Sequence, residues 1–282
     1  MASNFRAVEA DGYEKIMGRF SRKLAGTFIG FTGHLPGEKI LDVGCGTGSL
    51  SFALAALGDH AEIVGIDAAE PYVAFARSYN TDPRVTFRIG DASSLPFPNA
   101  YFDRAFSQLV FQFLPDPLPA VKEMRRVVRP GGMVAACVWD AYGGQPHIRM
   151  LWDTASTLGF TKSHNLIRSL STDGEMEAMW RKAGLIDVMP GEIIMRFEFD
   201  NFDDYWSPLL SGEGPMGEMV MSLTSEQRTT LEKQLRQIFL SNRPGGHEGA
   251  AAVGTVAQEN LPKGLSLWLS FKPSGHIRDG VR

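Results

Sequence analysis

Short apolar runs alternate with amphipathic segments between residues 39 and 140. The segments repeat apolar residues at helical spacing, as Leu50, Leu54 and Leu57 do ahead of Gly58. The runs have the length and composition of buried strands, and they cover residues 39–43, 62–67, 84–91, 102–108 and 133–139. This alternation predicts an α/β fold, an open and mostly parallel sheet with helices on both faces.

A helix is predicted ahead of the first strand. Apolar side chains recur at about four-residue spacing over residues 11–31, namely Ile16, Phe20, Leu24, Phe28 and Phe31. Asp11, followed three residues later by Glu14, resembles a capping box at the start of this helix.

The regular alternation of strand and helix patterns ends after residue 140. Helical patterns lie near residues 145–159, 172–183, 202–210 and 224–240, and a strand pattern lies at 193–199. We interpret 1–140 as an N-terminal helix plus a core, and 141–258 as a helical cap that also holds the last strands of the sheet. Residues 259–282 form a tail of uncertain structure, in which 265–271 has a strand-like pattern.

Composition sets limits on partners and location. The 282 residues are 44% hydrophobic with a net charge of −4, so a uniformly basic surface for nucleic acid is not expected, although a local basic patch stays open. The two cysteines, Cys45 and Cys137, form no disulfide framework. The first residues lack the apolar core of a signal peptide, and no run of about 18 apolar residues is present. We therefore expect a cytoplasmic protein without a membrane span.

The stretch ILDVGCGTGS at residues 40–49 joins the first strand to a helix. Its glycines lie at positions 44, 46 and 48, and glycine tolerates positive φ and the close approach of a ligand. The dinucleotide fingerprint G-x-G-x-x-G would require glycine at position 49, which is a serine here. The carboxylate of Asp42, just before the loop, would repel a pyrophosphate and would attract an ammonium group. S-adenosylmethionine (SAM) carries an ammonium and a sulfonium and no phosphate, so the loop suits SAM better than a dinucleotide.

Four motifs extend this interpretation. LDVGCGTGS, VGIDAAE, GDASSLPF and MRRVVRPGGMV follow one another in the order and spacing of class I SAM-dependent methyltransferases. The chain resembles the small-molecule branch that includes the ubiquinone and menaquinone C-methyltransferases, over roughly residues 12–140, and GYEKIMGRFSRKLA resembles the N-terminal helix of a subgroup. The resemblance implies a Rossmann-like, seven-stranded sheet with one antiparallel edge strand and a helical cap.

The motifs assign roles to residues at the ends of the strands. Asp67 ends the second strand, where a carboxylate can accept hydrogen bonds from both ribose hydroxyls; the alternative is a solvated loop aspartate or a helix cap. The resemblance implies that the Asp91 side chain accepts a hydrogen bond from the adenine amino group and that the Ala92 backbone contacts a ring nitrogen. The alternative for Asp91 is an ordinary Asx turn. Gln108 ends the fourth strand beside the methionine moiety, unless it caps the strand end.

The N-terminal helix closes over the cofactor in related enzymes. It carries Tyr13, Met17 and Arg19, and Arg19 either pairs with the methionine carboxylate or is a solvated surface arginine. Cys45 is interpreted as a small loop residue that fills space. The complete set expected at the cofactor is Asp42, Gly44, Cys45, Gly46, Asp67, Ala68, Asp91, Ala92, Gln108, Tyr13, Met17 and Arg19.

Methyl transfer from a sulfonium is an in-line displacement, so alignment is the enzyme's main task and a base is needed only if the acceptor loses a proton. The sequence identifies no residue as that base. His147, after the fifth strand, is a candidate base and is otherwise a loop or cap histidine. Trp139, His147 and Trp152 are candidates for the acceptor pocket, against plain core packing of the tryptophans. The six histidines show no metal-ligand spacing, so no metal is expected.

The sequence favours a small-molecule acceptor, apolar or aromatic in character. SQLV ends the fourth strand, where amino-methylating nucleic-acid enzymes share an N/D-P-P-Y/F motif. Methionines concentrate between residues 150 and 221, which suits an adaptable apolar pocket but also an ordinary cap core. We predict methylation at carbon, oxygen or nitrogen, with S-adenosylhomocysteine (SAH) as product. A SAM-binding partner protein without turnover and an NAD(P)-dependent oxidoreductase are the alternatives, and the oligomeric state is left open.

Overall fold

The computed structural model describes residues 10–140, 145–160, 170, 174–195, 197–240, 251–253 and 265–271. Its central sheet has the strand order β3-β2-β1-β4-β5-β9-β6. Parallel pairing joins the first five strands, which are β1 (Lys39–Val43), β2 (Glu62–Asp67), β3 (Val85–Ile89), β4 (Phe102–Gln108) and β5 (Val128–Trp139). The parallel α/β core expected from the sequence is therefore present.

The far side of the sheet differs from the expected arrangement. Strand β9 (Leu265–Phe271) runs antiparallel to β5 and to β6 (Val188–Glu192), between which it lies. The antiparallel strand thus lies one place inside the edge, whereas we expected it at the edge itself. It also comes from the segment that we interpreted as a tail, so part of this tail completes the sheet.

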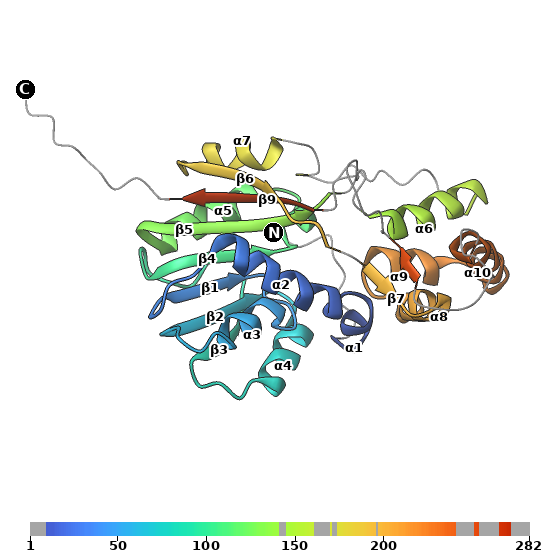
Figure 1. Ribbon diagram of the computed structural model, residues 1–282, viewed down its shortest axis with the longest axis horizontal. Coiled ribbons are helices and arrows are strands. Elements are labelled where there is room, and N and C mark those ends of the chain that lie inside the picture. Colours follow the sequence, from blue (N-terminus) through green and yellow to red (C-terminus); the bar gives the residue numbers. More distant parts are fainter. Residues whose placement is uncertain are drawn as a thin grey trace, which may run out of the picture.

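Alternation along β5 shows why the sheet is covered on both faces. Met133, Ala135 and Cys137 belong to one buried cluster, whereas Val134 and Ala136 belong to another, as the two-residue period of a strand requires. The first cluster includes residues of α2 (Arg19–Thr32), α3 (Ser49–Ala55) and α4 (Glu70–Tyr79), and the second includes residues of α5 (Leu118–Val127) and α7 (Glu175–Lys182). These helices form the two outer layers around the sheet (Figure 1).

The N-terminal helix is continuous but irregular. It consists of α1 (Ala10–Tyr13), a π-helical turn η1 (Glu14–Gly18) and α2. The helix begins at Ala10, so Asp11 lies in its first turn and is not the cap that we expected. The Glu14 carboxylate instead accepts a hydrogen bond from the Thr47 hydroxyl at 2.5 Å, which ties this helix to the glycine loop. Such π-helical turns frequently mark functional sites.

A second group of elements lies beyond the ends at which β1–β5 finish (Figure 1). It contains α6 (Pro146–Thr157), β7 (Phe197–Phe199), α8 (Phe202–Trp206), η3 (Ser207–Ser211), α9 (Gly214–Ser222), α10 (Ser225–Leu240) and β8 (Ala251–Val253). The strand expected at 193–199 is reduced to β7, which pairs with β8 outside the main sheet. No helix was expected at α9; it packs closely through Gly217, where a Cβ would lie 2.7 Å from the Gly212 backbone. None of the helices in the described ranges is long and apolar enough to cross a bilayer.

Candidate functional site

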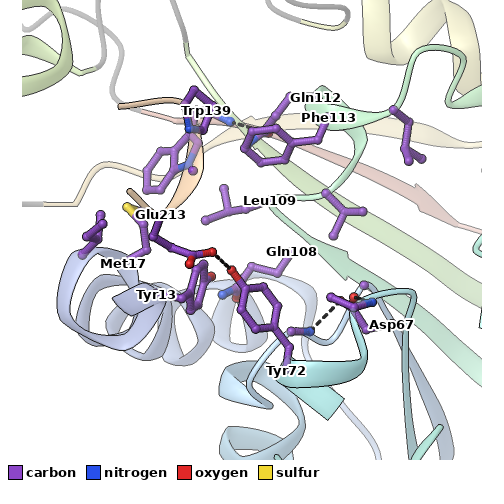
Figure 2. A pocket seen from close by; sticks show the side chains of 18 of the residues that line it. Tyr13, Met17, Asp67, Tyr72, Gln108, Leu109, Gln112, Phe113, Trp139 and Glu213 are labelled. Carbon is purple, nitrogen blue, oxygen red and sulfur yellow. Dashed lines mark hydrogen bonds between the residues drawn. The ribbon is translucent and has the colours of Figure 1, made fainter. Parts of the chain in front are cut away.

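A cavity of about 650 Å³ opens between the carboxyl ends of the parallel strands and the cap. In an open α/β sheet, ligands bind at this edge. Its lining includes most of the residues expected at a cofactor, namely Tyr13, Met17, Gly44, Gly46, Asp67, Ala68, Asp91, Ala92 and Gln108. Figure 2 shows that Asp67 and Tyr72 lie toward one end of the cavity, whereas Gln112, Phe113 and Trp139 lie toward the other.

The glycine loop has the backbone that its spacing predicted. Gly44, Gly46 and Gly48 have φ values of 75°, 53° and 91°, in the left-handed region that favours glycine. A Cβ on Gly44 would lie 2.3 Å from Val110 Cγ2, whereas a Cβ on Gly46 would meet no atom within 4 Å. The loop is thus packed against Val110 at Gly44 and is open at Gly46. The open position allows a ligand to approach the backbone closely.

Asp67 links two loops at the end of β2. One carboxylate oxygen accepts a hydrogen bond from the Gly46 N–H, and the other accepts one from the Ala69 N–H, both at 2.8 Å. Burial raises the pKa of this carboxyl group, against the lowering effect of these backbone donors. Each oxygen keeps a second lone pair, so the carboxylate can still accept hydrogen bonds from a ligand.

Two further expected residues combine a structural contact with a place in the lining. Asp91 accepts a hydrogen bond from the Ser93 N–H at 2.7 Å, the Asx turn that we considered as the alternative, and it still lines the cavity. The Gln108 amide donates to the Ser21 carbonyl oxygen at 2.9 Å. Its own oxygen, Oε1, is buried without a hydrogen-bond partner. Gln108 therefore offers an acceptor at the cavity, suited to a ligand N–H or O–H group.

Asp42 does not line the cavity, contrary to its expected position beside an ammonium group. It is 1% exposed and accepts a hydrogen bond from the Ser51 hydroxyl of α3 at 2.7 Å. The reason is strand alternation, which turns Asp42 to the same face as Ile40, beneath α3. Its second oxygen, Oδ1, has no partner, and burial raises the pKa of Asp42 to about 7.

Cys45 and Arg19 also lie outside the lining. Cys45 is buried in the core, where desolvation raises the pKa of its thiol. Arg19 donates from Nη1 to the Asp204 carboxylate of α8 at 2.9 Å, so it joins the N-terminal helix to the cap. Two residues along a helix point in roughly opposite directions, and Met17 faces the cavity; this explains why Arg19 faces away.

His147 lies away from the cavity, where it cannot serve as the base that we considered. It is 3% exposed and outside the lining, and its ring centroid lies 4.3 Å from that of Phe197. Burial lowers the pKa of His147 to about 3, so the ring is neutral at pH 7 and packed among aromatic side chains. Trp139 and Trp152, the other two candidates for the acceptor pocket, do line the cavity.

Several lining residues were missed from the sequence. Tyr72 of α4 donates a hydrogen bond to Glu213, which is 3% exposed and immediately precedes α9 (Figure 2). Burial raises the pKa of Tyr72, so its hydroxyl keeps the proton that it donates. Gln112 and Gln145 bring two amide groups to the lining. Gln145 precedes α6 and shares one helical face with Ile148 and Trp152 (i, i+3, i+7), the only sequence signal for this side of the cavity.

The position of Asp42 predicts an unusual pH dependence. The folded state holds the Asp42 proton up to about pH 7, whereas the unfolded chain releases it near 3.8. The free energy of unfolding therefore falls as the pH rises from about 3.8 to about 7. Above pH 7 both states are ionised at Asp42, and the free energy of unfolding no longer changes through this group. Asp42→Asn keeps an acceptor for Ser51 without the charge. Its advantage in unfolding free energy should grow from pH 4 to pH 7, measured by urea denaturation, while cofactor affinity stays unchanged.

Asp82→Asn provides the control with the opposite sign. The Arg84 side chain lowers the pKa of Asp82 to about 2, so any stability that this pair contributes is lost only at lower pH. A constant difference between Asp42→Asn and the parent chain from pH 4 to pH 8 would contradict the burial argument.

Comparison with known proteins agrees with this geometry. Residues 41–136 match the family described as "Methyltransferase domain". The chain is 34% identical over 152 residues to demethylmenaquinone methyltransferase of Lysinibacillus sphaericus, covering 51% of this chain and 63% of that protein. It is 36% identical over 110 residues to 27-O-demethylrifamycin SV methyltransferase of Amycolatopsis mediterranei, covering 36% and 40%. The chain thus spans less than two thirds of the length of these relatives.

The fold has counterparts among solved structures. The YcgJ protein of Bacillus subtilis superposes with a TM-score of 0.55 at 18% identity, covering 91% of this chain and 100% of that one. At this identity the likeness supports the α/β fold alone, and the similarity to methyltransferases comes from the sequence matches. Residues 41–136 therefore match a methyltransferase domain, and this part of the chain is similar to demethylmenaquinone methyltransferase.

Proposed function

We propose that this protein transfers the methyl group of SAM to a small-molecule acceptor, as an enzyme of class EC 2.1.1. The observation that carries the proposal is the single cavity lining shared by the glycine loop, Asp67 and Asp91 on one side and by Trp139 of β5 and Trp152 of the cap on the other. A donor and an acceptor can meet in such a cavity. The named relatives are methyltransferases, which leaves the nicotinamide-dependent alternative without support.

SAM would lie across the carboxyl ends of β1, β2 and β3. Asp67 is oriented by the Gly46 and Ala69 N–H groups and would accept hydrogen bonds from the ribose hydroxyls. Asp91 and Ala92 would meet the adenine, and the unpartnered Oε1 of Gln108 would accept from the ammonium of the methionine moiety. Tyr13 of α1 and Met17 of η1 would cover the cofactor, while Asp42 and Cys45 would support the loop from the core.

The acceptor would lie between β5 and α6. Trp139 and Trp152 line this part with apolar surface, and two buried amide nitrogens, Gln112 Nε2 and Gln145 Nε2, have no hydrogen-bond partner. The orientation of the Gln112 amide is fixed, because its oxygen accepts from the Trp139 N–H at 3.2 Å; an N–H donor cannot face another donor. Two free donors among aromatic walls suit a planar, mostly apolar acceptor that carries an oxygen atom.

The chemistry of transfer follows from this arrangement. The acceptor nucleophile, methyl carbon and sulfur must lie in line, and the cavity contributes by holding donor and acceptor and by excluding water. Where the acceptor loses a proton, Glu213 is the carboxylate placed to accept it, because it is buried in the lining and oriented by Tyr72. Methylation at carbon, oxygen or nitrogen is compatible with these groups.

The proposal includes the organisation of the chain. We assign residues 1–140 to the SAM-binding core and 141–258 to the cap, and we extend the core to include β6 and β9, which give the sheet its seven strands. We place the protein in the cytoplasm, in keeping with the two buried free thiols of Cys45 and Cys137.

Binding of oxygenated ring compounds to the SAH-bound chain tests the acceptor side. We expect 2-naphthol to bind about 10-fold more tightly than naphthalene, the gain of roughly one hydrogen bond, with quenching of tryptophan fluorescence. Gln112→Leu should remove this preference. Gln237→Leu, an exposed glutamine of α10, should retain it. Equal binding of naphthalene and 2-naphthol by the unaltered chain would contradict an oxygen-recognising acceptor pocket.

A further inference from the structure

A second cluster of functional side chains lies away from the cavity, where β1 and β2 begin. His34 follows α2, and Asp59 and His60 lie between α3 and β2. The two loops are held together by backbone hydrogen bonds, from the Gly37 N–H to the Asp59 carbonyl at 2.7 Å and from the Ala61 N–H to the Glu38 carbonyl at 3.0 Å. The loop backbone therefore fixes the three side chains side by side.

The three side chains converge on one point. His34 Nδ1 and His60 Nε2 each lie 3.8 Å from Asp59 Oδ1, and one potential ligand atom from each residue lies within 4.8 Å of the other two. These separations are too long for hydrogen bonds. Accordingly His34 Nδ1, Asp59 Oδ1 and both ring nitrogens of His60 are buried without a hydrogen-bond partner.

Neighbouring charged groups do not account for the cluster. Glu38 pairs with Arg104 at 2.7 Å, and Arg84 pairs with Asp82, so each of these four charges is already balanced. Each unsatisfied buried polar group costs about 1–3 kcal/mol, and several such groups at one point require an explanation. One bound cation would satisfy three of the four atoms together, one from each residue.

We propose that His34 Nδ1, His60 Nε2 and Asp59 Oδ1 bind one Zn²⁺ ion. Ligand distances of about 2.0–2.2 Å in a tetrahedron place ligand atoms roughly 3.3–3.5 Å apart. The two 3.8 Å separations from Asp59 Oδ1 would therefore close by about 0.3–0.5 Å, and the separation between the two histidine nitrogens, which is within 4.8 Å, by at most about 1.5 Å. Two imidazole nitrogens and one carboxylate favour Zn²⁺ over Mg²⁺ or Ca²⁺, which prefer oxygen ligands.

The surroundings allow a fourth ligand from solvent. The His34 and Asp59 side chains are 27% and 35% exposed, so water can complete the coordination. The ion would join the loop after α2 to the loop before β2 and stabilise the amino ends of the strands, apart from the methyl-transfer site.

Zinc titration of the untagged chain, after treatment with EDTA and dialysis, tests this site. We expect one Zn²⁺ per chain by calorimetry, a rise in melting temperature that EDTA reverses, and the visible absorption of four-coordinate Co²⁺ when cobalt replaces zinc. His34→Gln and Asp59→Asn, both at partly exposed positions, should weaken zinc binding by at least about 100-fold, more than the 10- to 100-fold typical of a lost supporting group.

Two comparisons separate loss of zinc from loss of structure. In EDTA, the variants should melt at the temperature of the EDTA-treated parent chain, and His276→Gln, which removes a histidine that is not one of the three proposed ligands, should bind zinc as the parent does. Zinc binding by His34→Gln as tight as by the parent chain, or no binding by the parent at micromolar zinc, would overturn the proposal. SAH affinity should be the same with and without zinc, so failure here leaves the methyl-transfer proposal unaffected.

Discussion

Asp67→Ala is expected to weaken the binding of SAM and SAH by about 100-fold, the loss of two hydrogen bonds to a charged group or roughly 2–3 kcal/mol. The carboxylate is buried, and its two oxygens are already aligned by the Gly46 and Ala69 N–H groups. Removing it deprives a ligand ribose of its acceptor and also releases the glycine loop. Calorimetric titration with SAH measures the effect.

Asp82→Ala is the matched control for this experiment. Asp82 is a carboxylate that pairs with Arg84 ahead of β3, outside the cavity, so its loss should leave SAH affinity within about 2-fold, the scatter expected for surface changes. NADH should bind neither protein. An Asp67→Ala variant that binds SAH as tightly as the parent chain would remove Asp67 from the cofactor site.

Gly44→Ala is expected to destabilise the folded chain by about 2–4 kcal/mol, the sum of a left-handed alanine and an overpacked contact. Gly44 has φ of 75°, and its added Cβ would lie 2.3 Å from Val110 Cγ2. Relief of this contact requires the loop or the Val110 side chain to move, and both line the cavity, so SAH affinity should fall as well. Urea denaturation of the ligand-free variant measures the first effect.

A second substitution separates the two causes. Val110→Ala removes both methyl carbons that the new side chain would meet, so the double variant should recover the packing part of the loss and keep the conformational part. Gly46→Ala, at φ of 53° with no atom within 4 Å, should cost only about 1–2 kcal/mol. Destabilisation by Gly44→Ala no greater than that by Gly46→Ala would show that Val110 does not support the loop.

The meeting of Gly44, Gly46 and Asp67 at one cavity was predictable, because it follows from local patterns. Gly44, Gly46 and Asp67 occupy loops that directly follow parallel strands, and such strands end at one edge of the sheet. The errors came from side-chain direction. Asp42 lies within β1, where its side chain shares a face with Ile40 and contacts α3, whereas Gly44 lies in the loop beyond the strand. Arg19 is two residues from Met17, but the helix turns it toward Asp204.

The acceptor side was predictable only in part, because it forms from contacts between distant segments. Trp139 at the end of β5 and Trp152 in α6 line the cavity, in keeping with the prediction from the sequence. Glu213, just before α9, lines it as well and contacts Tyr72, which no local pattern indicates. The His34, Asp59 and His60 cluster was missed for the same reason, since the loops that carry it meet only in the folded chain. Strand β9 entered the interior of the sheet because long-range pairing, rather than local pattern, sets strand order.

Transfer of a labelled methyl group tests the central claim most directly. The chain would be incubated with methyl-labelled SAM and a panel of hydroxylated planar acceptors, with the label followed into extractable product and SAH measured in parallel. We predict equal amounts of methylated product and SAH, and loss of both in Asp67→Ala. Tight binding of SAM and SAH without label transfer to any acceptor in the panel would contradict the claim and favour a SAM-binding protein without turnover.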